Sequence, residues 1–248
     1  MTESDTVAPD RTQAATIGLL YPGHSAEDDY PALEERLGGA VRLPLVHTSV
    51  DLDAHEVGAL LDLGNPKRLA DGARELPPGV DVVLWACTSG SFVFGWDGAR
   101  KQVDELAAIL GTPASSTSIA FVEALRTLGL SRVSIAASYP EPVAQSFVDF
   151  LGRGGMTVTA MGFHDIFTAA EVGTLDEAGV LELGRGAKVD GAEALLIPDT
   201  AMHTLSYLEA LEEAVGIPVL TANQVTVHEG LRLLGPVPRL PGLGTLFR

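Results

Sequence analysis

The only cysteine of the 248-residue chain, Cys87, directly follows an apolar run with the composition of a buried strand. That run, residues 80–86, is rich in valine, and Thr88, Ser89 and Gly90 come after the cysteine. Ligands bind at the carboxyl ends of strands in open parallel sheets, and small residues that begin a helix there offer backbone amides to an anion. We therefore expect Cys87 to have a lowered thiol pKa and to act as a nucleophile or base. The alternative is a small buried apolar residue without a chemical role.

A second candidate, Asp199, occupies the corresponding place in the other half of the chain. Ala86-Cys87-Thr88 is echoed by Pro198-Asp199-Thr200, and residues 17–22 are echoed by residues 133–140 at a similar offset. These echoes predict a duplicated unit, in which Cys87 and Asp199 lie on opposite walls of one cleft. Burial beside a thiolate would raise the pKa of Asp199 and make it an acid near neutral pH. The alternative for Asp199 is a helix N-cap.

Strand-like and helix-like segments alternate along the chain, which predicts an α/β fold with parallel sheets covered by helices. The predicted strands cover residues 15–21, 41–46, 80–86, 132–137, 157–161, 194–197 and 218–222. The predicted helices cover residues 31–37, 65–76, 97–110, 117–128, 141–151, 176–189, 205–215 and 225–234. We expect residues 1–14 to form a flexible tail and residues 235–248 to pack on a neighbouring subunit.

The composition excludes several classes of function. A formal net charge of −17 argues against nucleic acid and anionic membranes as partners. A single cysteine forms no intrachain disulfide, no cysteine or histidine cluster has the spacing of a zinc site, and no apolar run is long enough to span a membrane, so we expect a cytoplasmic protein. Because no basic residue lies in these motifs, a substrate carboxylate would be held by amides and hydroxyls, including those of Thr88, Ser89 and Thr200.

Four segments carry a resemblance to a known family: Ala86-Cys87-Thr88-Ser89-Gly90-Ser91-Phe92, residues 116–129, Ala137-Ser138-Tyr139, and residues 195–205. On these segments the chain resembles the aspartate/glutamate racemase superfamily, and within it the branch of maleate cis-trans isomerase and arylmalonate decarboxylase. The resemblance implies two pseudosymmetric Rossmann-like domains with parallel four-stranded sheets and an active site in the cleft between them. We assign residues 15–115 and 218–248 to the first domain and residues 116–217 to the second. The resemblance also implies no cofactor and no metal, and often a dimer or a larger homo-oligomer such as a tetramer.

The resemblance also assigns roles to single residues. Cys87 stands where the isomerases and racemases have their first catalytic cysteine and where the decarboxylase has a glycine. Thr88 and Ser89 stand where the family holds a substrate carboxylate, and Tyr139 matches a tyrosine whose phenol reaches the same group. Asp199 departs from the family because it falls where the second catalytic cysteine should be.

Further candidates lie in the loops around this cleft. Ser25 and Ile166 stand where the family uses substrate-binding asparagines, which puts maleate itself in question as the substrate. Tyr21 and His55 are candidate lining residues, although a tyrosine that packs at a strand end and an exposed helix histidine are the alternatives. His24 is a further candidate for contact with the substrate, and His203 for orienting Asp199.

These observations lead to one main hypothesis and three alternatives. The main hypothesis is a cofactor-independent isomerase or racemase of a small carboxylic acid, with Cys87 as nucleophile or base and Asp199 as the opposing acid or base. The first alternative is a decarboxylase of a malonate-type acid, with an apolar pocket near Phe92, Phe94 and Trp96. The other two are a non-catalytic binding relative and a hydrolase in which Asp199 activates water.

Overall fold

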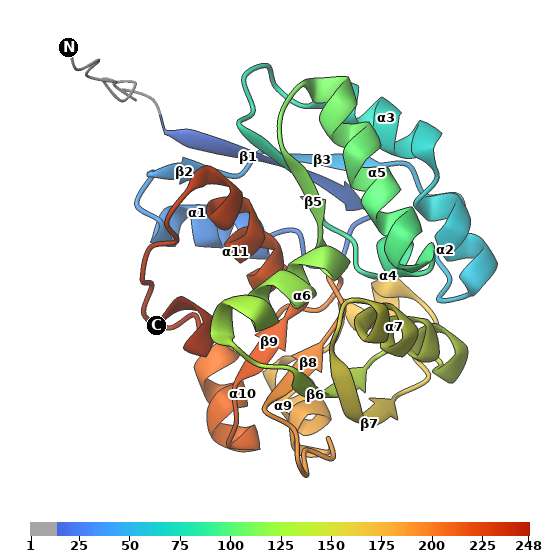
Figure 1. Ribbon diagram of the computed structural model, residues 1–248, viewed down its shortest axis with the longest axis vertical. Helices are drawn as coiled ribbons and strands as arrows, with labels where there is room; N and C mark the ends of the chain where they lie inside the picture. Colours follow the sequence, from blue (N-terminus) through green and yellow to red (C-terminus); the bar gives the residue numbers. More distant parts are fainter. Residues whose placement is uncertain (1–13) are drawn as a thin grey trace, which may run out of the picture.

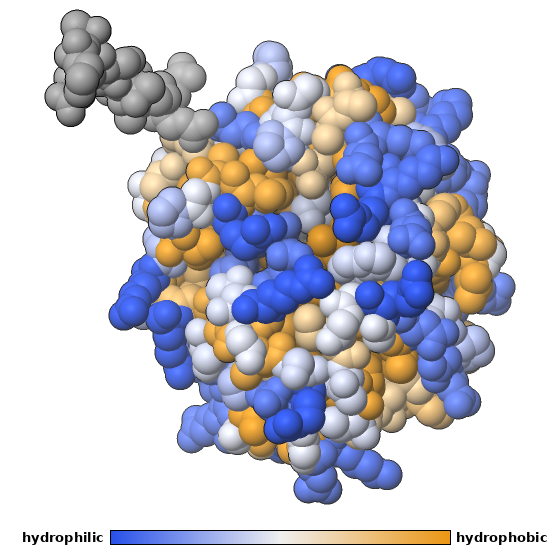
Figure 2. Space-filling view, viewed as in Figure 1, coloured by the Kyte–Doolittle hydropathy of each residue, from blue (hydrophilic) through white to orange (hydrophobic). Residues whose placement is uncertain are grey.

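Two parallel β-sheets, one from each half of the chain, organise the computed structural model, which describes residues 14–248. In Figure 1 the first sheet lies in the upper half and the second in the lower half. Except for Ala14, the predicted tail at 1–14 lies outside the described residues. Hydrophilic residues are spread over both halves of the face in Figure 2, as expected for a chain with a net charge of −17.

The first sheet contains β1 (Ala15–Pro22), β2 (Val41–Arg42), β3 (Leu45–Thr48), β4 (Val82–Trp85) and β5 (Ala114–Ser116). Its order is β2-β1-β4-β5, and β3 also pairs with β1. The sequence predicted one strand over residues 41–46, but the chain pairs with β1 twice because Pro44 interrupts the run. The sheet thus has four strand positions, one of them divided.

The second sheet contains β6 (Arg132–Ala137), β7 (Thr157–Phe163), β8 (Ala194–Ile197) and β9 (Val219–Thr221) in the order β7-β6-β8-β9. This order repeats that of the first sheet, with β6 in the place of β1 and β8 in the place of β4. The predicted fold of two pseudosymmetric α/β units is therefore confirmed.

Helices cover both sheets and join them. The first half contains α1 (Asp29–Arg36), α2 (Val57–Leu63), α3 (Pro66–Glu75), α4 (Ser89–Phe92), α5 (Gly95–Leu110) and α6 (Thr117–Leu128). The second half contains α7 (Glu141–Arg153), α8 (Ala169–Val172), α9 (Glu177–Arg185), α10 (Leu208–Val215), α11 (Ala222–Leu234) and the short 3-10 helix η1 (Thr245–Phe247). Helices α6 and α11 pack against each other between the sheets (Figure 1), where the Thr117 and Thr226 hydroxyls share a buried 2.6 Å hydrogen bond.

The pairing of β9 suggests a different boundary between the two units from the one expected from the sequence. Strand β9 pairs with β8 in the second sheet, although residues 218–221 fall within the first domain as assigned from the sequence. Helix α11 packs against β4, β1 and β5 of the first sheet. We propose that the second unit runs to the end of β9 and that the first unit resumes at α11.

The C-terminal segment packs on its own chain, and its predicted contact with a neighbouring subunit stays a prediction. Leu243, Leu246 and Phe247 are buried, and Gln224 donates a 2.7 Å hydrogen bond to the Leu243 carbonyl. Apolar side chains in this segment cover α11, which explains why a stretch without helical periodicity is ordered. Within residues 14–248, no helix is both long and apolar enough to cross a membrane.

Candidate active site

Cys87 lies where the sequence placed it, between the end of β4 and the start of α4. The side chain is 3% exposed, and its Sγ accepts a 3.3 Å hydrogen bond from the Gly90 amide. The Ser89 hydroxyl lies 3.9 Å from the same sulfur. A Cβ at position 90 would lie 3.1 Å from Sγ, so glycine lets the amide approach the sulfur closely.

The structure contradicts the predicted low pKa of this thiol. Burial, with a smaller contribution from the Asp199 carboxylate, raises the pKa of Cys87 to about 12 despite the lowering effect of the Gly90 and Ser89 contacts. Helix α4 has four residues, too few for a strong dipole, and among residues 14–248 no lysine or arginine lines the cavity described below. Desolvation therefore dominates, and Cys87 is a neutral thiol at pH 7.

Asp199 occupies the equivalent position after β8 and is 4% exposed. One carboxyl oxygen accepts a hydrogen bond from the Ser138 hydroxyl, and the other accepts a 3.0 Å bond from the Ala201 amide. Burial nevertheless raises the pKa of Asp199, although the nearby His55 acts in the opposite direction. The amide contact closes a turn and not a helix, because residues 200–201 are non-helical.

A cavity of about 250 Å³ connects the two groups. Cys87 and Asp199 both line it, together with five more of the residues predicted from the sequence: Tyr21, Ser25, His55, Ser89 and Thr200. The remaining two predicted residues, Thr88 and Tyr139, are buried outside the lining. Among the described lining residues there is no lysine or arginine, so hydroxyls and backbone amides are the groups available to a carboxylate.

Tyr139 lies behind His55 and is a structural neighbour of the cavity. Its phenol donates a hydrogen bond to the Pro198 carbonyl, and its ring meets the His55 ring edge-on with centroids 4.9 Å apart. Burial raises its pKa well above the ordinary value, so the phenol keeps its proton. Thr88 is also fully buried, and its Oγ1 makes no hydrogen bond of ordinary geometry within the described chain.

Tyr21 joins the two units at the cavity floor. Its hydroxyl donates a 2.9 Å hydrogen bond to the Thr200 carbonyl and accepts a 3.1 Å bond from the Ala26 amide. Burial raises its pKa far above the ordinary value. Tyr21 thus ties the loop after β1 to the loop that carries Asp199.

A second connection between the units was not predicted from the sequence. Asp53, which also lines the cavity, accepts hydrogen bonds of 2.8 and 3.0 Å from the Ala169 and Ala170 amides at the start of α8. His55 uses its Nδ1 for a 2.8 Å hydrogen bond to the Ile166 carbonyl. The position of Asp53, two residues before His55, was the available signal. It was missed because Asp53 lies in the long connection after β3, away from any strand end.

Several sequence predictions about the cavity wall are wrong. Phe92, Phe94 and Trp96 do not line the cavity, and Phe92 packs on Tyr139 and Phe147. The apolar part of the wall consists instead of Val50, Leu52, Ala59, Leu60 and Leu63, among others. His203 does not orient Asp199, because its Nε2 lies 2.7 Å from an Asp28 carboxyl oxygen. His24 does reach the cavity, at its rim.

Comparison with known proteins places this architecture in a family. The sequence profile described as arylmalonate decarboxylase matches residues 66–247. The chain belongs to the arylmalonate decarboxylase family. This match covers more than half of the chain and includes the segments with Cys87 and Asp199.

Individual relatives extend over most of the chain. A maleate isomerase of Nocardia farcinica is 27% identical over 248 residues, which cover 94% of this chain and 95% of the relative. An arylmalonate decarboxylase of Bordetella bronchiseptica is 26% identical over 183 residues, 72% of this chain and 76% of the relative. The predicted branch of the superfamily is confirmed.

The solved structures agree with the fold. A cysteine-to-serine variant of the Nocardia farcinica maleate cis-trans isomerase, with a covalently bound succinylcysteine intermediate, has a TM-score of 0.84 at 25% identity. The alignment covers 95% of this chain and 98% of that structure. The same isomerase bound to TRIS has a TM-score of 0.84 at 26% identity.

Proposed function

We propose that this protein is a cofactor-independent cis-trans isomerase of a small carboxylic acid, with Cys87 as the nucleophile and Asp199 as the opposing acid and base. The observation that carries this proposal is the single cavity into which two equivalent strand ends bring a thiol and a carboxyl group. The covalent succinylcysteine in the Nocardia farcinica relative supports addition of a cysteine sulfur to the substrate.

The two raised pKa values fit a reaction in which one proton moves between the groups. Sγ of Cys87 forms a bond to one alkene carbon while the π electrons move to the carbon beside the carboxylate. The thiol proton passes to the Asp199 carboxylate, whose burial raises its proton affinity, and from there to that carbon. After rotation about the single C–C bond, the reverse steps break the C–S bond and release the trans acid. Atoms and electrons balance over the cycle.

The lining favours a monoanionic substrate over a dianion. The cavity contains Asp53 and Asp199, and its described lining has histidines but no lysine or arginine, so a second substrate carboxylate would meet repulsion without a permanently charged partner. One carboxylate can be held by the hydroxyls of Ser25, Ser89 and Thr200. A volume of about 250 Å³ is suited to a small carboxylic acid.

Proton NMR in D2O tests this proposal with a panel of cis-enoic acids that includes maleate and its methyl homologue. We expect conversion of a cis signal into a trans signal by the unchanged protein, and none by Cys87→Ala. Asp199→Asn should retain the fold and lose turnover. Full turnover by either variant would contradict the two-residue mechanism, and proton exchange at a chiral carbon without isomerisation would replace it with racemisation.

A second candidate function is decarboxylation of a malonate-type acid. It is favoured by the family profile and by the apolar wall formed by Val50, Leu52, Leu60 and Leu63, which suits an apolar substituent. Aryl- and alkylmalonates in the same NMR panel distinguish the two functions. Release of CO2 with deuterium in the product would favour the decarboxylase over the isomerase. The homo-oligomer and the cytoplasmic location stay predictions, and light scattering of the purified protein measures the former.

A further inference from the structure

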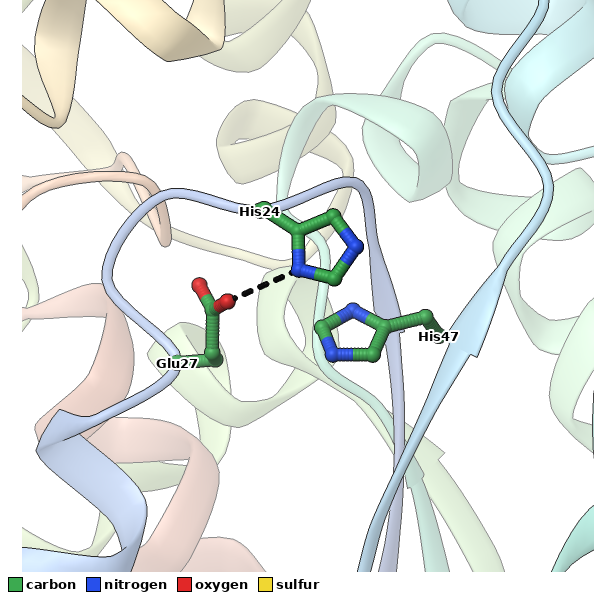
Figure 3. Close-up of side chains that lie close together, drawn as sticks. All are labelled: His24, Glu27 and His47. Atoms are coloured by element: carbon green, nitrogen blue, oxygen red, sulfur yellow. Dashed lines mark hydrogen bonds and ion pairs between the residues drawn. The ribbon is translucent and has the colours of Figure 1, made fainter.

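Two histidines and a glutamate, His24, His47 and Glu27, lie close together, as Figure 3 shows. His24 is the one of the three that lines the cavity. His24 and Glu27 belong to the loop after β1, and His47 belongs to β3. Because β1 and β3 are parallel neighbours with Tyr21 opposite His47, the loop after β1 folds back over the end of β3. One potential ligand atom from each of the three side chains lies within 4.8 Å of the others.

Backbone contacts orient two of the three side chains. The Nδ1 of His47 lies 2.6 Å from the Gly23 carbonyl and donates to it, which leaves Nε2 as a lone-pair donor. Gly23 has a φ of +65°, in the left-handed region that favours glycine, and its carbonyl is thereby available to the ring. Histidines that bind metals commonly donate their other ring N–H to a backbone carbonyl in this way.

The glutamate is fixed in the same manner. Its Oε2 accepts a 2.6 Å hydrogen bond from the Ser25 amide, and its Oε1 lies 3.0 Å from Nδ1 of His24. The rings of His24 and His47 lie beside each other with centroids 3.9 Å apart. Figure 3 shows the Glu27 carboxylate facing both rings. The donor set is therefore two imidazole nitrogens and one carboxylate oxygen.

We propose that His24, Glu27 and His47 bind one Zn²⁺ ion. Two histidines and a glutamate are a common ligand set for Zn²⁺, whereas Mg²⁺ and Ca²⁺ prefer oxygen ligands. Bonds of about 2.0–2.1 Å in a tetrahedron separate ligand atoms by about 3.3 Å. The ligand atoms now lie within 4.8 Å of one another, and binding requires the two overlapping rings to rotate so that their nitrogens point at the ion. The ion takes the place of the proton that His24 Nδ1 shares with Glu27, and that proton leaves to solvent.

The site lies beside the cavity and keeps one coordination position open. His24 and Ser25 line the cavity rim, while the His24 side chain is 73% exposed, so solvent or a substrate oxygen reaches the ion. The ion would bring positive charge to a cavity whose lining, among residues 14–248, contains no lysine or arginine. Binding of zinc at this site does not depend on the proposed isomerase activity.

Isothermal titration of Zn²⁺ into the full chain tests the proposal. We expect one ion per chain, with affinity weakened at least about 100-fold in His47→Ala and in His24→Ala, and about 10-fold in Glu27→Gln. His164→Ala is the matched control, because His164 is exposed and its Nδ1 also contacts a backbone carbonyl, 3.0 Å away. That variant should bind zinc like the unchanged chain.

A second measurement excludes other zinc sites. Co²⁺ in place of Zn²⁺ should give the visible absorption of a tetrahedral complex, and His47→Ala should abolish it. Binding that survives His47→Ala but disappears in Cys87→Ala would place the ion at the thiol and overturn the proposal. The proposal would also be overturned if His164→Ala lost as much zinc affinity as His47→Ala. The same holds if the unchanged protein, with the circular dichroism of a folded chain, bound no zinc at micromolar concentration.

Discussion

The ionisation of Cys87 is the property of this site that can be measured most directly, because the chain has a single cysteine. Burial raises its pKa to about 12 from an ordinary value of 9.0. At about 1.4 kcal/mol per pKa unit, the folded protein disfavours the thiolate by about 4 kcal/mol relative to an exposed thiol. At pH 7 the thiolate fraction should then be about 1000-fold smaller than that of an exposed cysteine.

The ultraviolet absorbance of the thiolate follows this ionisation, with Cys87→Ala as the reference that removes the tyrosine contribution. We expect the difference signal to rise only above pH 10. The rate of alkylation by iodoacetamide should rise tenfold per pH unit without reaching a plateau below that pH. The shape of this profile is independent of how easily the reagent enters the cavity.

A plateau of either signal below about pH 8 would refute the argument that desolvation dominates at this site. Such a plateau would mean that the amides of α4 lower the pKa of the thiol by more than burial and the Asp199 carboxylate raise it. Slow alkylation at pH 7 thus does not identify a non-catalytic relative, because an active enzyme that forms its thiolate only with substrate bound reacts slowly as well.

Three further predictions concern the surroundings of the site. Ser138→Ala removes a donor that stabilises the charged form of Asp199, so its pKa should rise further and the acidic limb of the pH–rate profile should shift upward. Burial lowers the pKa of His228 to about 4, so between pH 6.5 and 4 the histidine takes up a proton in the unfolded chain but not in the folded one. The free energy of unfolding should therefore fall by up to about 3 kcal/mol as the pH drops from 6.5 to 4, and urea titrations of His228→Leu should not show this loss. A Cβ at Gly64 would overlap a backbone carbonyl of α4, so Gly64→Ala should lower the free energy of unfolding in urea by about 1–3 kcal/mol. Gly58→Ala is the control: it lies in open space on α2, and the substitution should leave the stability unchanged or raise it.

Most of the fold could be predicted from the sequence because strand-helix alternation has strong local signals. Asn65 caps α3 through a 3.1 Å hydrogen bond from the Arg68 amide, as its place before a proline indicated. Gly129 ends α6 in the left-handed conformation. Both residues act through contacts with residues three or four positions away, so their effect can be predicted from the local sequence.

Elements that depend on distant contacts were missed. Strand β5 has the sequence Ala-Ser-Ser, which lacks the apolar character of a strand. The buried hydroxyl of Ser116 depends in part on Ser91, 25 residues away in the sequence, which supplies a 2.9 Å hydrogen bond. Helices α2 and α8 are short, and Asp53 gives α8 its amide partners from the other half of the chain. No local pattern contains that information.

The position of the proposed catalytic pair could likewise be predicted, but the sign of the thiol's pKa shift could not. The duplicated strand order brings Cys87 and Asp199 to one cavity, as the sequence echo indicated. The sequence suggested that backbone amides would stabilise a thiolate, whereas the raised pKa depends on how completely the folded chain excludes water around the sulfur. Burial raises the pKa of both Cys87 and Asp199, and a negative charge on one group disfavours a negative charge on the other. Ionisation of the two groups at the same time is therefore disfavoured. In the proposed mechanism a proton that leaves the thiol would therefore be held by the carboxyl group across the cavity, and the same constraint that keeps Cys87 neutral would let Asp199 act as the acid in the following step.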